Sequence, residues 1–187
     1  MTLTLDVGCG KRPRGDVNCD IIPQRAPNFV LCSAEYLPFR ENSFDYVMSY
    51  YVMEHCVDIV KFLSELYRVS RKEVRIMTDN SLWYVDILSL ILKGGARFTY
   101  EGHYHVFYPD SLERFLRKLG YNALVKIGNF GTEAEHMKKR EMSIKKAFSW
   151  LIKLLCLLRP KYYLFLSARD IFIVIKKNSG ARYIART

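Results

Sequence analysis

The sequence predicts an α/β protein whose mostly parallel β-sheet carries helices on both faces. Two observations favour this class. Short apolar runs alternate along the chain with longer segments of helical periodicity, as they do where helices connect parallel strands. These runs are also continuously apolar rather than alternating, which is typical of strands buried on both sides. The length of 187 residues suits one domain, so we expect a single domain over residues 1–187.

Four candidate strands lie in the first 50 residues and are joined by short segments. Their ranges are 3–7, 17–22, 29–32 and 44–50. The connection between the first two is too short and too rich in Gly and Pro for a full helix. Residues 57–69 then place apolar side chains at close to the helical period of about 3.6 residues, which predicts a helix.

The rest of the chain continues the alternation of strands and helices. Residues 81–91 are expected to be mainly helical, and Gly94 follows as a stop signal. A further helix is expected to begin at Pro109, where Asp110 or Ser111 can cap it. The three remaining candidate strands are residues 74–77, 121–127 and 171–175.

The positive charge of the chain is concentrated at its C-terminal end. The formal net charge is +10, yet residues 1–70 hold 7 Lys/Arg against 9 Asp/Glu. Residues 137–187 hold 13 Lys/Arg and only 2 Asp/Glu. A basic surface favours an anionic partner. We therefore expect any such partner at the C-terminal end of the chain.

The end of the first strand carries the first candidate binding motif. Asp6, Gly8 and Gly10 fall in the sequence LDVGCG, and two glycines one residue apart allow a tight turn close to a ligand. A dinucleotide fingerprint would need a further glycine where the chain has Pro13, which counts against a nicotinamide cofactor. Asp20 ends the second strand, where a carboxylate can accept both hydroxyls of a ribose or serve as a turn residue.

Several motifs in residues 3–80 occur together in the order typical of one family. They are LDVGCG, NCDI, AEYLPFRENSFDYVMSYYVMEH and ELYRVSRKEVRIMTDN. This series resembles the class I S-adenosylmethionine-dependent methyltransferases, and most closely their type 11 branch of small-molecule enzymes. The resemblance implies a Rossmann-like sheet of seven strands, the last of them antiparallel. It also implies S-adenosyl-L-methionine as cofactor, S-adenosyl-L-homocysteine as product, and residues 1–80 as the cofactor-binding half.

The resemblance further implies roles for individual residues on the methionine and ribose sides of the cofactor. Asp6, Gly8 and Gly10 would shape the pocket for the methionine half. Asp20 would hold the ribose hydroxyls. His55 stands where the recurring histidine of the family begins the next helix.

The adenine and sulfonium sides are assigned in the same way. Ser33, Ala34 and Glu35 would lie along the adenine, with backbone amides reading the base. Tyr50 and Tyr51 would close over the methionine and sulfonium region. Ser33 stands where many members of the family have an adenine-binding Asp, and a hydroxyl accepts a hydrogen bond less strongly than a carboxylate.

A second departure from the family lies in the first connection. Arg12 stands where the family commonly has its third glycine, and the first helix is expected to be deleted. Lys11, Arg12 and Arg14 would then lie near the carboxylate of the cofactor.

Candidates for a general base lie beyond the fifth predicted strand. His103 and His105 would point to the same side of an extended segment, and Asp79 and Tyr104 are further candidates. A structural, hydrogen-bonded role for the two histidines is the alternative. Metal binding by the histidine pair lacks an evident third ligand, so we assign no metal site.

The segment of residues 143–166 combines apolar side chains with Lys and Arg, and four interpretations of it stay open. It can cover the core or the pocket, or form a homodimer interface. It can also contribute, within residues 138–177, to binding of an anionic membrane surface or of RNA. Residues 81–108 and 132–166 are expected to be variable insertions that serve as substrate lid or interaction surface.

The sequence therefore predicts a methyltransferase that acts on a small-molecule, lipid-linked or glycan-linked acceptor. An RNA methyltransferase and a non-catalytic cofactor-binding protein are the alternatives. The five cysteines have no zinc-like spacing, and the first residues lack the pattern of a secretory signal. We therefore expect a cytoplasmic protein that can associate peripherally with a membrane.

Overall fold

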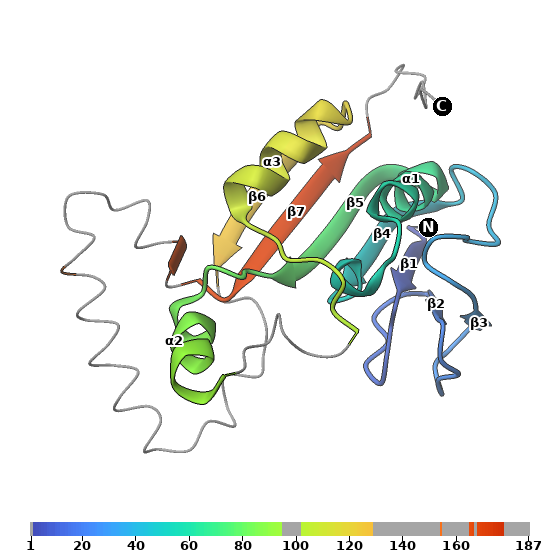
Figure 1. The fold of residues 1–187 in the computed structure, drawn as a ribbon. Helices are drawn as coiled ribbons and strands as arrows, with labels where there is room; N and C mark the ends of the chain where they lie inside the picture. The colour runs from blue at the N-terminus through green and yellow to red at the C-terminus, as the bar shows by residue number, and fades with distance from the viewer. Residues whose placement is uncertain (1, 95–101, 129–153, 155–164, 167, 178–187) are drawn as a thin grey trace.

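A seven-stranded sheet forms the centre of the molecule in the computed structural model, which describes residues 2–94, 102–128, 154, 165–166 and 168–177. The strand order is β3-β2-β1-β4-β5-β7-β6 (Figure 1). The strands are β1 (Thr4–Val7), β2 (Val17–Asp20), β3 (Phe29–Leu31), β4 (Phe44–Tyr50), β5 (Ser70–Asp79), β6 (Ala123–Gly128) and β7 (Asp170–Lys176).

Strands β1 to β5 pair in parallel, and β7 pairs antiparallel with both β5 and β6. The prediction of a mostly parallel sheet with an antiparallel last strand is confirmed. All seven strands fall where the sequence predicted them, with shifts of a few residues at their ends. The helical elements are η1 (Met53–His55), α1 (Ile59–Val69), α2 (Tyr84–Lys93) and α3 (Pro109–Lys118).

The ends of the helices follow local chemistry, with one difference from expectation. Asp58 caps α1 by accepting a hydrogen bond from the backbone N–H of Lys61 at 2.8 Å. Gly94 ends α2 in the left-handed region at φ 68°. The expected cap of α3 by Asp110 or Ser111 is wrong. Pro109 lies in the first turn, Tyr108 takes the N-cap position, and no side chain caps the helix.

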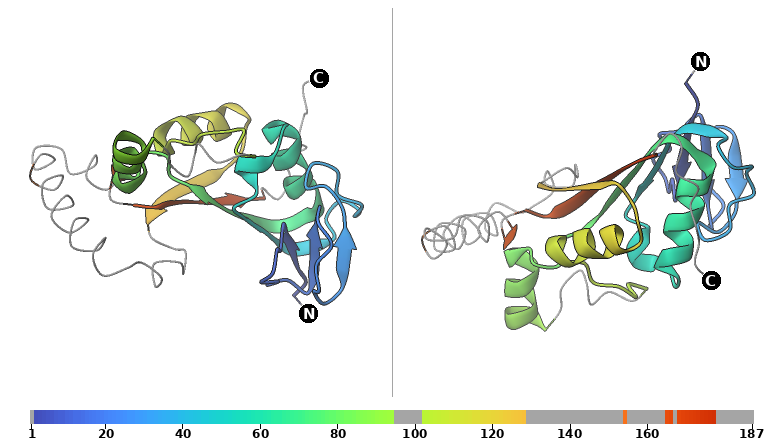
Figure 2. Two further views of the ribbon diagram at one scale, coloured as in Figure 1. Left: turned by 60° about the horizontal axis from the view of Figure 1, so that its bottom comes forward. Right: turned by 90° about the horizontal axis from the view of Figure 1, so that it is seen from above.

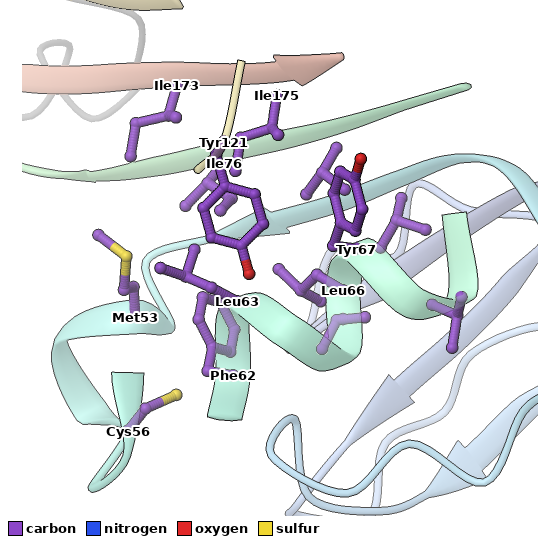
Figure 3. Packing of buried hydrophobic residues seen from close by; sticks show 14 of the residues in the cluster. Met53, Cys56, Phe62, Leu63, Leu66, Tyr67, Ile76, Tyr121, Ile173 and Ile175 are labelled. Atoms are coloured by element: carbon purple, nitrogen blue, oxygen red, sulfur yellow. The ribbon is translucent and has the colours of Figure 1, made fainter. Parts of the chain in front are cut away.

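Helix α1 packs its apolar face against the centre of the sheet. Phe62, Leu63 and Leu66 are fully buried there (Figure 3). The rings of Tyr67 and Tyr121 lie 5.3 Å apart and extend this core towards β6. Full burial of such side chains contributes roughly 1.5–3 kcal/mol each. The helix therefore fixes the position of the chain segments on either side of it.

The helices of the described residues all lie on one side of the sheet, as the two views of Figure 2 show. Helices on both faces were expected. Residues 8–16, 21–28 and 32–43 connect the first four strands without any helix. The described helices thus leave the opposite face uncovered, and Leu124 of β6 is 53% exposed. In the described part of the chain these three connections are too short for crossover helices, so helices on the second face stay a prediction for the residues outside it.

The basic segment of residues 143–166 lies almost wholly outside the described residues, as do residues 95–101 and 129–153. The predictions of a lid, a dimer interface or an anionic-partner surface in those ranges therefore stay predictions. Among the residues that the structure does describe, none of the helices is both long enough and apolar enough to span a bilayer.

Candidate functional site

A large cavity lies at the carboxyl ends of β1, β2 and β4, where the sheet order changes direction. In open parallel sheets this crevice is the usual ligand site. The cavity volume is about 1100 Å³, at the upper end of the roughly 300–1,000 Å³ range of ligand pockets. Nine of the residues predicted to bind the cofactor line it: Gly8, Gly10, Asp20, Ser33, Ala34, Glu35, Tyr50, Tyr51 and His55.

The loop after β1 forms the first wall with its backbone. The N–H groups of Gly8 and Cys9 donate to the carbonyl oxygen of Cys19 at 2.8 and 3.0 Å. Gly8 has φ 73°, and a Cβ atom there would lie 2.1 Å from Cγ2 of Val52. Only glycine allows this loop to pass so close to Val52 in the segment between β4 and η1, which explains why the motif needs a glycine at this position.

Asp6 does not line the cavity, but it holds the loop that forms this wall. Its side chain is fully buried, and Oδ2 accepts a hydrogen bond from the backbone N–H of Arg14 at 2.9 Å. This bond closes the short helix-free connection to β2. Oδ1 has no hydrogen-bond partner, and burial raises the pKa of the Asp6 carboxyl above its usual value. Asp6 therefore shapes the pocket indirectly, by fixing the loop that carries Lys11 and Arg12.

Asp20 stands at the end of β2 and faces the cavity. Its Oδ2 accepts from the N–H of Gly10 and its Oδ1 from the N–H of Ile22, both at 2.9 Å. Each carboxylate oxygen has two lone pairs, so each can still accept from a ligand hydroxyl. The two backbone bonds fix the orientation of the carboxylate. Ile21 and Ile22, which the sequence analysis did not single out, add exposed apolar surface beside it.

The segment around residues 33–39 forms the wall above β3. Ser33 Oγ accepts from the N–H of Glu35 at 3.2 Å. The Glu35 carboxylate is turned towards the segment before α1, where Oε1 accepts from the N–H groups of Val57 and Asp58 at 2.7 and 3.0 Å. Glu35 thus ties this wall of the cavity to the start of α1.

A partly buried ion pair on α1, between Glu65 and Arg68, also holds this segment. Glu65 Oε2 accepts from the N–H of Leu37 at 2.9 Å and from Arg68 at 2.7 Å. Arg68 also donates to the carbonyl oxygens of Leu37 and Phe39. The sequence did not reveal these contacts of Glu65 and Arg68 with residues 37–39, because a Glu and an Arg three residues apart on a helix resemble an ordinary surface pair.

Tyr50, the last residue of β4, and Tyr51, which follows it, form the opposite wall. The Arg14 guanidinium lies over the Tyr50 ring, 5.1 Å from its centroid. Tyr51 has φ 57°, an uncommon conformation for a bulky residue. Its hydroxyl donates to Asp170 Oδ1 at 3.0 Å, and burial, followed by the Asp170 charge, raises the Tyr51 pKa. The link to Asp170 crosses 119 positions of sequence, and no local signal in the sequence could have revealed it.

Of the three histidines predicted for the site, one lines the cavity and two do not. His55 on η1 lines it, as does Tyr104. The His103 ring lies 4.6 Å from the His55 ring, and His103 is not among the lining residues. His105 Nε2 lies 3.4 Å from the carbonyl oxygen of Val57 and also does not line the cavity. Arg169 lines the cavity too, and sequence reasoning missed it.

These residues fit the chemistry of S-adenosylmethionine. The carboxylate of Asp20, held by two amides, suits two vicinal hydroxyls. The side chains of Lys11, Arg12 and Arg14 line the same cavity and suit a carboxylate, and the apolar side chain of Ile21 suits a flat base. At Gly8 the first wall carries no side chain, so a ligand can lie against the backbone there.

Comparison with protein families and solved structures agrees with this arrangement. Residues 16–78 match a family model described as "Methyltransferase domain". A SAM-dependent methyltransferase from Archaeoglobus fulgidus is 16% identical with a TM-score of 0.59, over 94% of this chain and 86% of that one. A SAM-dependent methyltransferase from Thermotoga maritima, described as a possible histamine N-methyltransferase, is 13% identical with a TM-score of 0.60, over 95% and 83%.

A third solved structure contains the cofactor. It is the Haemonchus contortus phosphoethanolamine N-methyltransferase 2 in complex with S-adenosyl-L-methionine, 16% identical with a TM-score of 0.53, over 95% of this chain and 49% of that one. At these identities the likeness shows a shared fold. No curated protein matches this chain.

Proposed function

We propose that the chain is a class I S-adenosylmethionine-dependent methyltransferase and that it methylates a small-molecule, lipid-linked or glycan-linked acceptor in the cavity described above. The family match over residues 16–78 and the sheet order support the enzyme class and its cofactor. The observation that carries the assignment of the site is the carboxylate of Asp20, fixed by two backbone amides at the edge of the cavity.

Particular residues would hold the cofactor. Asp20 would accept from the ribose hydroxyls, and the segment from Ser33 to Glu35 would lie along the adenine. The loop from Gly8 to Gly10 would follow the methionine half, with Arg14 near its carboxylate. When bound, the cofactor supplies a methyl group on a positively charged sulfur, which a nucleophile can take by in-line displacement.

The protein would also position the acceptor and remove a proton from it with a general base. Tyr50 and Tyr51 form an aromatic wall that excludes water from the region between cofactor and acceptor. Good alignment of two reacting groups can contribute roughly 7–11 kcal/mol to the rate. His103 and His105 remain our proposal for a general base; neither lines the cavity, and the His103 ring lies 4.6 Å from the ring of His55, which does.

The acceptor class and the partners belong to the same proposal. Met77, Tyr104 and Arg169 also line the cavity, and we propose that a small acceptor group binds beside them. Residues 138–177 are proposed to contact an anionic membrane surface or RNA, and residues 143–166 a second copy of the chain. We propose a cytoplasmic location with peripheral membrane association.

Binding and transfer are tested separately. Isothermal titration calorimetry with S-adenosylhomocysteine should show one saturable site. Absence of heat up to millimolar ligand would contradict the proposal. Transfer is then measured with methyl-labelled S-adenosylmethionine on small-molecule, lipid and glycan fractions and on RNA. Label in an RNase-sensitive fraction would favour the RNA alternative. Binding without transfer to any fraction would favour a non-catalytic binding protein.

A further inference from the structure

Three metal-binding side chains meet beside the cavity. Glu54 and His55 come from η1, and His103 comes from the segment after Gly102. One potential ligand atom of each lies within 4.8 Å of those of the other two. Sequence reasoning paired His103 with His105 and found no third ligand. The structure instead joins His103 to two residues that lie almost 50 positions earlier.

His55 is held in the tautomer that a metal ligand needs. Its Nδ1 lies 2.8 Å from the carbonyl oxygen of Gly102. A carbonyl can only accept, so Nδ1 carries the proton and Nε2 keeps a lone pair. In metal sites, the second nitrogen of a ligating histidine commonly donates to a backbone carbonyl or a carboxylate in this way. Gly102 has φ 90°, a conformation that brings the carbonyl to His55 at little cost for glycine.

Glu54 supplies a buried carboxylate. Its side chain is only 2% exposed, and Oε2 accepts a hydrogen bond from Thr78 Oγ1 at 3.1 Å. A carboxylate oxygen is a favourable ligand for a divalent cation. The backbone of the segment is fixed as well, because the N–H of Tyr104 donates to the carbonyl oxygen of Glu54 at 2.9 Å. This bond holds the chain on one side of His103, and the Gly102 carbonyl bonded to His55 holds it on the other.

We propose that Glu54, His55 and His103 bind a divalent transition-metal cation, with Zn²⁺ as the best match. Two imidazoles and one carboxylate are a common ligand set for zinc and for non-haem iron, and both leave coordination positions open. His55 also lines the cavity, so an open position lies next to it. There the cation can hold an oxygen or nitrogen of the acceptor, and of the two histidines proposed as base only His105 then keeps its lone pair for a proton. That second role rests on the proposed methyl transfer, whereas metal binding itself does not.

The test uses the full chain after removal of metal, with Co²⁺ and Zn²⁺ as the probes. One equivalent of Co²⁺ should give a d–d absorption spectrum without a thiolate charge-transfer band, and Zn²⁺ should displace it. His55→Ala and His103→Ala should each weaken binding at least tenfold. His105→Ala is the matched control and should leave the metal affinity unchanged, because His105 lies outside the cluster. Glu54→Gln is a third variant, but loss of a buried carboxylate can disturb folding.

The proposal is overturned by any of three results. These are the absence of saturable binding at micromolar metal, equal affinity in wild type and His103→Ala, or a thiolate band, which would place the metal on cysteines. His103→Ala also separates this proposal from the function proposed above. His103 does not line the cavity, so this variant should lose the metal and still bind S-adenosylhomocysteine. If wild type binds metal but not S-adenosylhomocysteine, only the function proposal fails.

Discussion

The two walls of the cavity are built in different ways. The wall at the ends of β1, β2 and β3 comes from residues 8–35, and backbone amides and two carboxylates shape much of it. The opposite wall is made of side chains from positions as far apart as Tyr50, Tyr104 and Arg169. The first wall depends on local turns and short loops. The second depends on the packing of the whole sheet, so the two should respond differently to mutation.

The largest loss of folding stability is expected at Gly8 in the first wall, where there is no space for a side chain. Gly8→Ala combines a left-handed backbone with a Cβ atom at 2.1 Å from Val52 Cγ2. Left-handed strain costs about 1–2 kcal/mol and overpacking about 1–3 kcal/mol, so urea unfolding should show a loss of about 2–5 kcal/mol.

Gly10→Ala is the control for this variant. Gly10 has φ 53°, but a Cβ atom there meets nothing within 4 Å, so only the backbone strain of about 1–2 kcal/mol should appear. Val52→Ala should restore part of the stability of Gly8→Ala and none of that of Gly10→Ala. Equal losses in the two glycine variants would show that the close approach to Val52 does not matter.

A smaller loss is expected in the second wall from Tyr51→Phe. The change removes the hydroxyl that donates to Oδ1 of Asp170, a residue with no exposed surface. A hydrogen bond to a charged group contributes about 1.5–3 kcal/mol, and Arg169 Nε stays 3.6 Å from the same oxygen, so we expect a loss of about 1.5 kcal/mol in chemical denaturation. Tyr104→Phe is the matched control, because Tyr104 is 65% exposed and should show no loss. If both variants are as stable as wild type, the Tyr51–Asp170 bond does not support this wall.

The smallest effect should be a gain in stability with a pH dependence. Burial raises the pKa of Asp6, so ionised Asp6 destabilises the folded state. Asp6→Asn should be more stable than wild type by about 1 kcal/mol at pH 8, the low end of the cost of an unsatisfied buried group. Below the unfolded pKa of about 3.9 the gain should vanish, and it should grow as the pH rises through the folded pKa. Unfolding curves at a series of pH values measure it. A gain that is constant with pH would mean that the Asp6 charge is not its cause.

The contrast between the walls also explains what the sequence could predict. Asp20, Gly8 and Gly10 follow strands directly, and parallel strands bring their carboxyl ends to one edge, so these side chains could be placed together. Arg169 and the contact of His55 with Gly102 depend on how distant segments pack, and no spacing reveals them. Helices on both faces were predicted from a general rule for parallel sheets, which short connections between the first four strands override in the described residues.

Affinity for S-adenosylhomocysteine in wild type, Asp20→Ala and Tyr104→Ala tests the division between the walls most directly. Both residues line the cavity, one in each wall. Calorimetry should show about 1–3 kcal/mol weaker binding for Asp20→Ala, the scale of a lost charged hydrogen bond, and an affinity within about twofold of wild type for Tyr104→Ala. An unchanged affinity in Asp20→Ala, or an equal loss in both variants, would contradict the account.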